Sequence, residues 1–267
     1  MKIDFHVHAF ADKIAKRAID NLLEHTDTPN ITDGTFSDTI EKLKARGIDK
    51  AVFLGIATKP TQQTVLNDWA KFVIDEGWYA FGSIHPLAED SLAELERIKT
   101  LGLYGIKLHP EYQNFFADDE KMFPVYQKCS DLKLPITFHC GYDPISGEQI
   151  RCMPKMLAKI SDIFPDLTII AAHLGGTKEI GETLEYLAGK DGNIYFDTAI
   201  VPYYMGFLDI EKIIKKHGTD RILFASDCPW GDPLYISNIF DMLNFTTEEK
   251  ENIYYKNALR VLQCDNK

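Results

Sequence analysis

Two histidines near the start of the chain are spaced in a way that suits metal binding. His6 and His8 lie within residues 2–8, KIDFHVH, where apolar and polar residues alternate. In an extended strand, residues two apart point to the same face, so both imidazoles are expected on one side. Neutral imidazole nitrogens are common ligands of zinc and other transition-metal ions. The pair is therefore predicted to form half of a metal site.

Four later segments end in residues of the same chemical type. Each is a short apolar run rich in β-forming residues, and the terminal residues are His109, His139, His173 and Asp227. If the segments are parallel strands of one barrel, their C-terminal ends meet at one rim, where barrel enzymes place their functional groups. We therefore expect these side chains to meet the first pair of histidines.

The gathered residues would supply a catalytic site of the zinc type, with a position left open for water. The predicted ligands are His6, His8, His139 and Asp227. His173 would remain free to hold or transfer a proton, because imidazole titrates near neutral pH. The carboxylate of Asp227 could also act as a base. Zn²⁺ is the expected ion, and Mn²⁺ is the alternative.

The elements that must position these residues follow a βα rhythm. Eight short apolar runs are predicted as strands, at residues 3–8, 51–56, 79–84, 104–109, 135–140, 168–173, 194–197 and 222–227. Helix start signals lie between them: Ser91 with Glu94 and Thr246 with Glu249 are spaced as capping boxes, and Pro154 suits a first helical turn. The alternation predicts a (β/α)₈ TIM barrel forming a single domain over residues 1–267. A doubly wound open sheet is the other fold considered, but no glycine-rich loop follows the first strand.

The composition of the chain argues against some classes of binding partner. The chain of 267 residues has 29 basic and 40 acidic residues, a net charge of −11 that disfavours nucleic acid and anionic membrane surfaces. No apolar run is long enough to span a bilayer and no secretory signal is recognised, so a cytoplasmic location is expected. Five cysteines without CxxC spacing are expected to be reduced thiols. A homodimer is compatible with the sequence.

Four motifs together resemble the amidohydrolase superfamily. They are the His-x-His pair, PITFHCG at 135–141, AAHLGG at 171–176 and LFASDCPW at 223–230. More narrowly, the chain is similar to the branch that includes aminocarboxymuconate-semialdehyde decarboxylase and many metal-dependent hydrolases. The resemblance implies the same four metal ligands and the same catalytic histidine. It leaves the substrate open, because members of the superfamily are hydrolases or non-oxidative decarboxylases.

The fourth predicted strand carries Lys107 and His109 on one face. Binuclear members of the superfamily carry a carboxylated lysine or a glutamate there, so a carboxylated Lys107 would allow a second ion. One ion is favoured, with Lys107 in a salt bridge and His109 in contact with substrate.

Further candidates for substrate contact lie in the loops. Arg151 and Arg17 are the arginines expected near the rim, where either could hold a carboxylate. Trp230 and Tyr142 are candidate apolar walls of the pocket, and His85 ends the third predicted strand.

Two chemistries fit this site. The leading hypothesis is a metal-dependent hydrolase in which bound water attacks a small amide, ester or lactone. The alternative is non-oxidative decarboxylation of a small unsaturated or aromatic carboxylate at the same site. A TatD-type nuclease is disfavoured by Lys107 and the acidic charge. A catalytically inactive scaffold is disfavoured because every expected ligand is present.

Overall fold

The computed structural model describes residues 1–24 and 30–264. Residues 25–34 form a polar stretch that the sequence predicts as a solvated loop, and residues 25–29 of it, including His25, lie outside the described residues. Among the described residues, no helix is long and apolar enough to cross a membrane.

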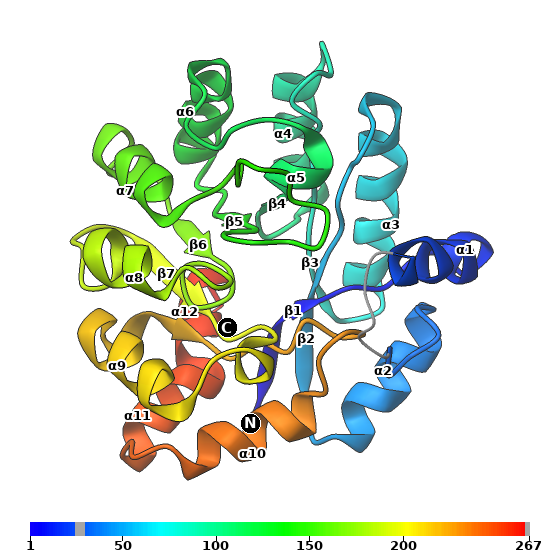
Figure 1. The fold of residues 1–267 in the computed structure, drawn as a ribbon. Coiled ribbons are helices and arrows are strands. Elements are labelled where there is room, and N and C mark those ends of the chain that lie inside the picture. Colours follow the sequence, from blue (N-terminus) through cyan, green and yellow to red (C-terminus); the bar gives the residue numbers. More distant parts are fainter. Residues whose placement is uncertain (25–29, 265–267) are drawn as a thin grey trace.

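Eight parallel strands form the centre of the molecule (Figure 1). They are β1 (Ile3–Val7), β2 (Lys50–Leu54), β3 (Tyr79–Phe81), β4 (Ile106–Leu108), β5 (Ile136–Phe138), β6 (Ile169–Ala171), β7 (Ile194–Asp197) and β8 (Ile222–Leu223). Each predicted run overlaps one of these strands, although most strands are shorter than predicted and β2 begins one residue earlier. Parallel bridges from Gly82 to Ile106 and from Val7 to Cys228 join β3 to β4 and β8 to β1. The sheet thus closes, and the predicted (β/α)₈ barrel is confirmed.

Helices surround the barrel (Figure 1). The α-helices are α1 (Asp12–Leu23), α2 (Phe36–Ala45), α3 (Gln63–Asp75), α4 (Ser91–Leu101), α5 (Pro110–Gln113), α6 (Phe123–Leu132), α7 (Pro154–Ile163), α8 (Ile180–Glu182), α9 (Phe207–His217), α10 (Pro233–Met242), α11 (Thr247–Glu251) and α12 (Asn257–Val261). Short 3₁₀ turns are η1 (Pro60–Gln62), η2 (Glu120–Met122), η4 (Val201–Tyr203) and η5 (Thr219–Arg221), and π-helical segments are η3 (Thr183–Leu187) and η6 (Asn252–Lys256).

Two of the three predicted helix starts are confirmed, and the third is wrong. Thr246 and Glu249 form a capping box at the start of α11, and Pro154 is the first residue of α7. The box predicted at Ser91 does not form, because Asp90 occupies the N-cap position and Glu94 accepts a hydrogen bond from Asn67 instead. A buried amide partner therefore outcompetes the local cap.

A β-bulge lies in β1 between Asp4 and Val7, where the strand reaches the first metal-ligand candidates. Asp4 pairs with Ala51 and Val7 with Phe53, so β1 has one extra residue relative to β2. Phe5 contacts Phe81 edge to face, with ring centroids 5.6 Å apart. Since β1 and β3 are not neighbours, this contact runs across the concave inner side of the sheet. A bulge of this kind bends the strand locally; His6 lies within it and His8 just after it, at the barrel mouth.

A buried histidine fixes α9 against β7. The ring of His217 stacks on Phe196, with centroids 3.8 Å apart. Its Nε2 donates to the carbonyl of Ile194 at 3.0 Å, and its Nδ1 accepts from the amide of Gly189 at 3.3 Å. This pattern needs the neutral ring, and burial lowers the pKa of His217 to about 3, helped by the nearby Arg221.

This arrangement predicts an acid-sensitive contribution to stability. Because the folded pKa lies below the ordinary value of about 6.5, the unfolded chain binds the proton first. The contribution of His217 is therefore present above that pH and is lost below it, at up to about 1.4 kcal/mol per pH unit. Urea unfolding between pH 7.5 and 5 in the presence of a chelator should give a shallower slope for His217→Gln than for the wild type. Lys212→Gln, on the exposed side of the same helix, should keep the wild-type slope; equal slopes for all three proteins would contradict the assignment.

Candidate metal centre

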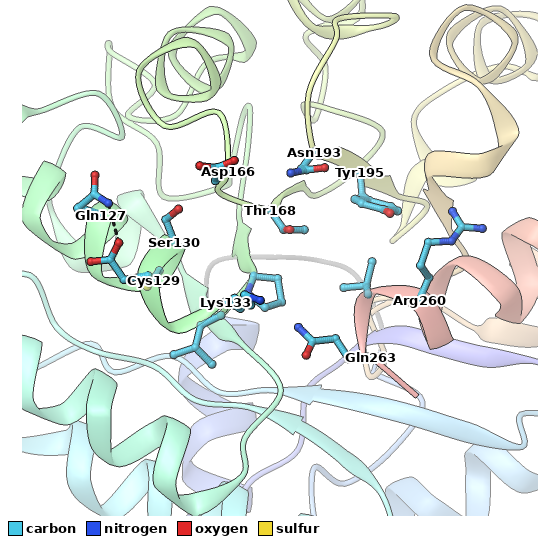
Figure 2. A pocket seen from close by; sticks show the side chains of 14 residues that line it. Gln127, Cys129, Ser130, Lys133, Asp166, Thr168, Asn193, Tyr195, Arg260 and Gln263 are labelled. Atoms are coloured by element: carbon cyan, nitrogen blue, oxygen red, sulfur yellow. Dashed lines mark hydrogen bonds between the residues drawn. The ribbon is translucent and has the colours of Figure 1, made fainter. Parts of the chain in front are cut away.

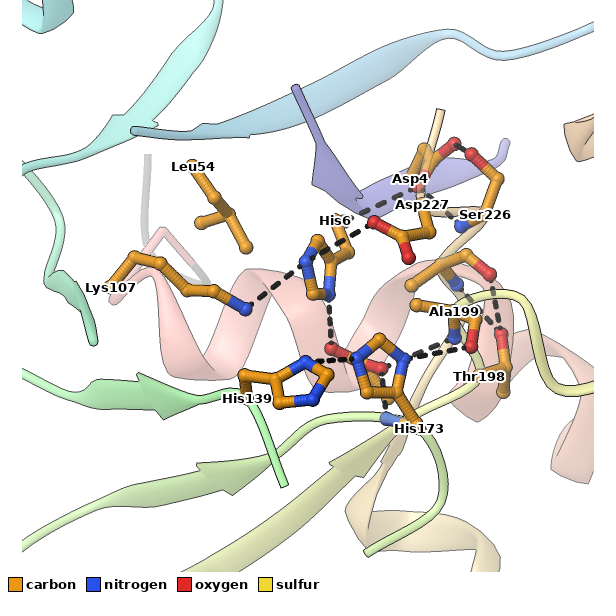
Figure 3. Close-up of polar contacts among 12 residues, drawn as sticks. Asp4, His6, Leu54, Lys107, His139, His173, Thr198, Ala199, Ser226 and Asp227 are labelled. Carbon is orange, nitrogen blue, oxygen red and sulfur yellow. Dashed lines mark hydrogen bonds and ion pairs between the residues drawn. The ribbon is translucent and has the colours of Figure 1, made fainter. Parts of the chain in front are cut away.

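The side chains expected at the strand ends do meet at the mouth of the barrel (Figure 3). The closest group is formed by His6, His8 and Asp227, whose ligand atoms lie within 4.8 Å of one another. Barrel closure creates this group, since the amide of Asp227 donates to the carbonyl of His6 at 2.9 Å. Two of the expected site residues, His173 and Asp227, adopt left-handed backbone conformations, with φ of 62° and 66°. Such conformations are costly for residues other than glycine and are often found at functional sites.

The Nδ1 atoms of His6 and His8 already form hydrogen bonds within the protein. His6 Nδ1 lies 2.8 Å from a carboxylate oxygen of Asp197, and His8 Nδ1 lies 2.7 Å from the carbonyl oxygen of Leu54. Both partners are acceptors, so both Nδ1 atoms carry the proton. In the neutral rings the Nε2 atoms then present lone pairs to the site.

These lone pairs converge on a third acceptor. His6 Nε2 and His8 Nε2 are 3.2 Å apart, and they lie 3.6 and 3.3 Å from Oδ1 of Asp227. Burial, and next the ammonium of Lys107, lower the pKa of His6 well below its usual value. Although burial opposes ionisation of Asp227, the adjacent His6 and His8 hold the pKa of its carboxyl below the ordinary value. The ammonium of Lys107 lies 3.2 Å from His6 Nε2, and the set of two imidazole nitrogens and a carboxylate fits a divalent metal ion.

A second chain of hydrogen bonds fixes His173 and His139. His173 Nδ1 donates to the carbonyl of Ala199 at 3.1 Å, so its Nε2 accepts from His139 Nδ1, 3.0 Å away (Figure 3). His139 Nε2 is consequently a buried lone pair, and within the described part of the chain it has no hydrogen-bond partner. Burial and the neighbouring His109 lower the pKa of His139. Its free nitrogen therefore has the properties of a ligand.

His139 lies apart from the first three candidates in this structure. It groups with His109 and Asp143, whose ligand atoms also lie within 4.8 Å of one another. The rings of His109 and His139 stack 4.1 Å apart, and Asp143 lies 3.5 Å from His109 Nε2 and 3.9 Å from His139 Nε2. Asp143 was not among the sequence candidates, because it lies in the loop after β5, where position alone gives no signal.

Asp197 is the other residue that sequence reasoning missed. One of its oxygens accepts from His6 Nδ1, and the other accepts from the amides of His173 and Ala199 at 2.8 and 3.2 Å. A signal was available, since Asp197 is the last residue of the seventh predicted strand and therefore points to the same rim. It orients two site histidines rather than facing the site itself.

Lys107 is fully buried beside the metal-ligand candidates. Its Nζ lies 3.2 Å from His6 Nε2, and burial lowers its pKa to about 8. An ammonium here places a fixed positive charge at the floor of the site. The structure thus brings Lys107 and His109 to the mouth, as expected.

The loop residues predicted to contact substrate lie outside the two groups of metal-ligand candidates. Arg151 pairs with Glu111, with Nε 3.5 Å from Oε2, and its backbone amide also donates to Glu111. Trp230 is partly exposed, and its amide donates to the carbonyl of Asp227 at 2.8 Å. Arg17 is exposed on α1. His85 Nδ1 accepts from the amide of Leu87, which indicates a turn-stabilising role.

The loops after β5 and β6 form one wall of the mouth. The amide of Thr177 donates to the carbonyl of Cys140, and the amide of Tyr142 donates to the carbonyl of Thr177, both at 2.9 Å. Gly141 lies between them with φ of 85°, and a Cβ there would lie 2.3 Å from the backbone nitrogen of Thr177. Only glycine fits this contact. In the same wall, the ammonium of Lys178 lies 3.8 Å from the ring centroid of Tyr142.

A separate hollow of about 550 Å³ lies at the opposite end of the strands (Figure 2). It is lined by residues that precede β5, β6 and β7, such as Thr168 and Asn193, and by Arg260 of α12. Neither group of metal-ligand candidates lines it. The chemistry of the molecule is therefore concentrated at the C-terminal mouth.

Comparisons with known proteins agree with this geometry. Residues 3–263 match the family model described as Amidohydrolase. The structure is similar to a TIM-barrel protein from Bordetella bronchiseptica, with 21% identity, a TM-score of 0.80 and 98% of each chain covered. It is also similar to 5-carboxyvanillate decarboxylase from Sphingomonas paucimobilis, with 16% identity, a TM-score of 0.75 and 98% of each chain covered.

A third similar structure contains a metal ion. It is a dihydroxybenzoic acid decarboxylase from Polaromonas sp. JS666 with bound manganese and the inhibitor 2-nitroresorcinol. The identity is 17% and the TM-score 0.73, over 100% of this chain and 98% of that one. No curated protein sequence matches the chain. At these identities the three structures establish the shared fold.

The converging lone pairs predict metal binding that depends on His8. Since loss of a residue that only orients a ligand typically costs 10–100-fold in affinity, His8→Ala should weaken Zn²⁺ and Mn²⁺ binding by at least about 100-fold. Titration calorimetry and the metal content after dialysis would measure this. His85→Ala removes a different histidine at the rim and should bind metal like the wild type. Unchanged affinity in His8→Ala would rule out the proposed ligand set.

Proposed function

The chain belongs to the amidohydrolase family, and we propose that it is a metal-dependent decarboxylase of small aromatic or unsaturated carboxylates. The observation that carries the proposal is the combination of three proton-free acceptors, His6, His8 and Asp227, with the buried ammonium of Lys107. A bound cation and a fixed ammonium side by side suit an anionic substrate. The presence of two carboxylate decarboxylases among the similar structures supports this choice over hydrolysis.

The proposed ligands of the ion are those predicted from the sequence: His6, His8, His139 and Asp227. The free Nε2 of His139 supports its inclusion. We propose one divalent ion; Zn²⁺ suits the imidazole-rich set, and Mn²⁺ deserves equal testing because a similar decarboxylase holds manganese. When bound, the ion would neutralise and orient the substrate carboxylate.

His173 is proposed to move the proton. Decarboxylation without oxidation replaces the carboxylate by a hydrogen: the carbon accepts a proton, the bond to the carboxyl group breaks, and carbon dioxide leaves with no net change in electrons. Nε2 of His173 faces the site, and Ala199 holds the opposite nitrogen, so the ring cannot turn away. Because Nε2 accepts from His139 Nδ1 in this structure, it would carry a proton only once that hydrogen bond opens. That proton would be delivered to the substrate carbon and replaced from solvent after each turnover.

The residues proposed to contact the substrate lie at different depths. Lys107 and His109 are buried at the floor and are proposed to contact the carboxylate. Arg151 is already paired with Glu111, and Trp230 is partly exposed, so both are proposed for the outer part of the pocket. The acidic net charge makes nucleic acid an unsuitable substrate.

Hydrolysis is the second candidate, and family membership supports it. The same acceptors would let a bound ion acidify water, and His173 would then act as a base toward a lactone, ester or amide. A substrate panel separates the two reactions, because only decarboxylation releases carbon dioxide from a stable acid.

The test is a panel of metal-loaded protein with hydroxybenzoates, unsaturated dicarboxylates, lactones and esters. We expect carbon dioxide release from at least one acid, and a loss of about 10²–10⁴-fold in kcat for His173→Asn with metal content unchanged. Asparagine is chosen because it tolerates the left-handed backbone at this position. His85→Asn is the matched control and should retain activity. Hydrolysis without carbon dioxide release would favour the second candidate, and full activity of His173→Asn would remove the proposed proton donor.

A further inference from the structure

We propose that Asp4 and Ser226 are a pair of positioning residues that hold Asp227 in the conformation needed to bind the metal ion, an inference that rests on the proposed metal site. Asp4 lies in β1, two residues before His6, and Ser226 directly precedes Asp227 in the segment after β8. Both residues are fully buried, and neither belongs to the proposed ligand set.

The carboxylate of Asp4 joins β1 to the segment after β8 (Figure 3). Its Oδ1 accepts from the amide of Ser226 at 2.9 Å and from the amide of His6 at 3.3 Å. Its Oδ2 accepts from the hydroxyl of Ser226. One carboxylate therefore binds the backbone of one proposed ligand and the residue next to another.

The hydroxyl of Ser226 extends this link past Asp227. While it donates to Asp4, it accepts from the amide of Cys228 at 3.0 Å. The amide of Asp227, which lies between them in the chain, donates to the carbonyl of His6 at 2.9 Å. Three consecutive amides around the proposed ligand are thus fixed, and two of them are held by the pair.

The backbone of Asp227 needs such support. Its φ of 66° is costly for a residue with a side chain, and a conformation of this kind persists only where its surroundings enforce it. The conformation sets the direction of the side chain, whose Oδ1 lies 3.3 Å from His8 Nε2 and 3.6 Å from His6 Nε2. The geometry of the ligand set therefore depends on the hydrogen bonds of Asp4 and Ser226.

A link between strands does not by itself require a carboxylate. Thr198 ties β7 to the segment after β8 with a hydroxyl alone, which donates to the carbonyl of Ala225 at 2.9 Å and accepts from its amide at 2.8 Å. Burying a carboxylate is more costly. All hydrogen bonds of the Asp4 carboxylate within the described part of the chain go to His6 and Ser226, which favours a role in positioning the ligands.

The test compares Ser226→Ala with Ser237→Ala. Ser237 is also fully buried, but its hydroxyl donates to the carbonyl of Leu234 within α10, at 3.1 Å. Titration calorimetry on the folded, metal-free proteins gives the dissociation constant of Zn²⁺, and urea unfolding gives their stability separately. The visible absorption of the Co²⁺-loaded proteins reports the geometry of the ligands.

We expect Ser226→Ala to weaken Zn²⁺ binding by roughly 10- to 100-fold, the range typical of residues that orient a metal ligand, and to change the Co²⁺ spectrum. Asp4→Asn keeps one oxygen for the two amides but places a donor opposite the Ser226 hydroxyl, so it should weaken binding as well. Because the two residues act as one unit, the double variant should bind about as weakly as the weaker single variant. Ser237→Ala should bind Zn²⁺ like the wild type.

Other results would overturn the positioning role. If Ser226→Ala and Asp4→Asn lose stability but keep the wild-type affinity for Zn²⁺, the pair is a structural link only. Should Ser226→Ala fail to fold, Asp4→Asn alone decides the same question. Losses that multiply in the double variant would contradict a single unit.

The same titrations separate this proposal from the proposed metal site. Weakened binding in His8→Ala together with unchanged binding in Ser226→Ala would overturn the role of the pair and leave the metal site intact. If the wild-type protein binds neither Zn²⁺ nor Mn²⁺, the proposed metal site fails and the role of the pair fails with it.

Discussion

The positions of two protons determine what the mouth of this barrel can bind. Asp197 and the carbonyl of Leu54 hold the protons of His6 and His8 on the outer side of each ring. The inner nitrogens and the carboxylate of Asp227 are then left as acceptors facing one another. Lys107 contacts the nitrogen of His6, and a bound metal ion would join all three acceptors. The proposed affinity for a metal ion depends on this arrangement. Together with the ammonium of Lys107, the bound ion would suit the site to an anionic substrate.

A single carboxylate connects the parts of the site. Asp197 binds the ring of His6 from β1 and the backbone of the segment after β6, while it belongs to β7 itself. The closing contact between β8 and β1 then brings Asp227 beside His6. The metal-binding half of the mouth is thus built from strands at both ends of the chain, and it can form only when the barrel closes.

Much of the fold follows from local patterns in the sequence. The eight apolar runs, the cap at Thr246 and the first-turn proline at Pro154 depend on neighbouring residues, and the structure contains them. The strand-end rule likewise gathers His6, His8 and Asp227. What could not be predicted depends on distant partners: the bulge that turns His6 past Phe5, and Asn67, which draws Glu94 away from the expected cap.

The same limit applies to the outer part of the site. Arg151 looks like a free cation in the sequence, but its partner Glu111 is 40 residues away and reaches it through the fold. Asp143 lies in the loop after β5, where the residue spacing has no period that reveals which side chains turn inward.

The backbone link at Gly141 has a consequence for how substrate range could change. Loops on a barrel are usually treated as independent modules, each free to be lengthened or replaced. Here the loops after β5 and β6 share hydrogen bonds through Cys140, Tyr142 and Thr177, and glycine is required at the crossing point. Natural divergence or laboratory evolution would therefore have to exchange the two loops together as one unit.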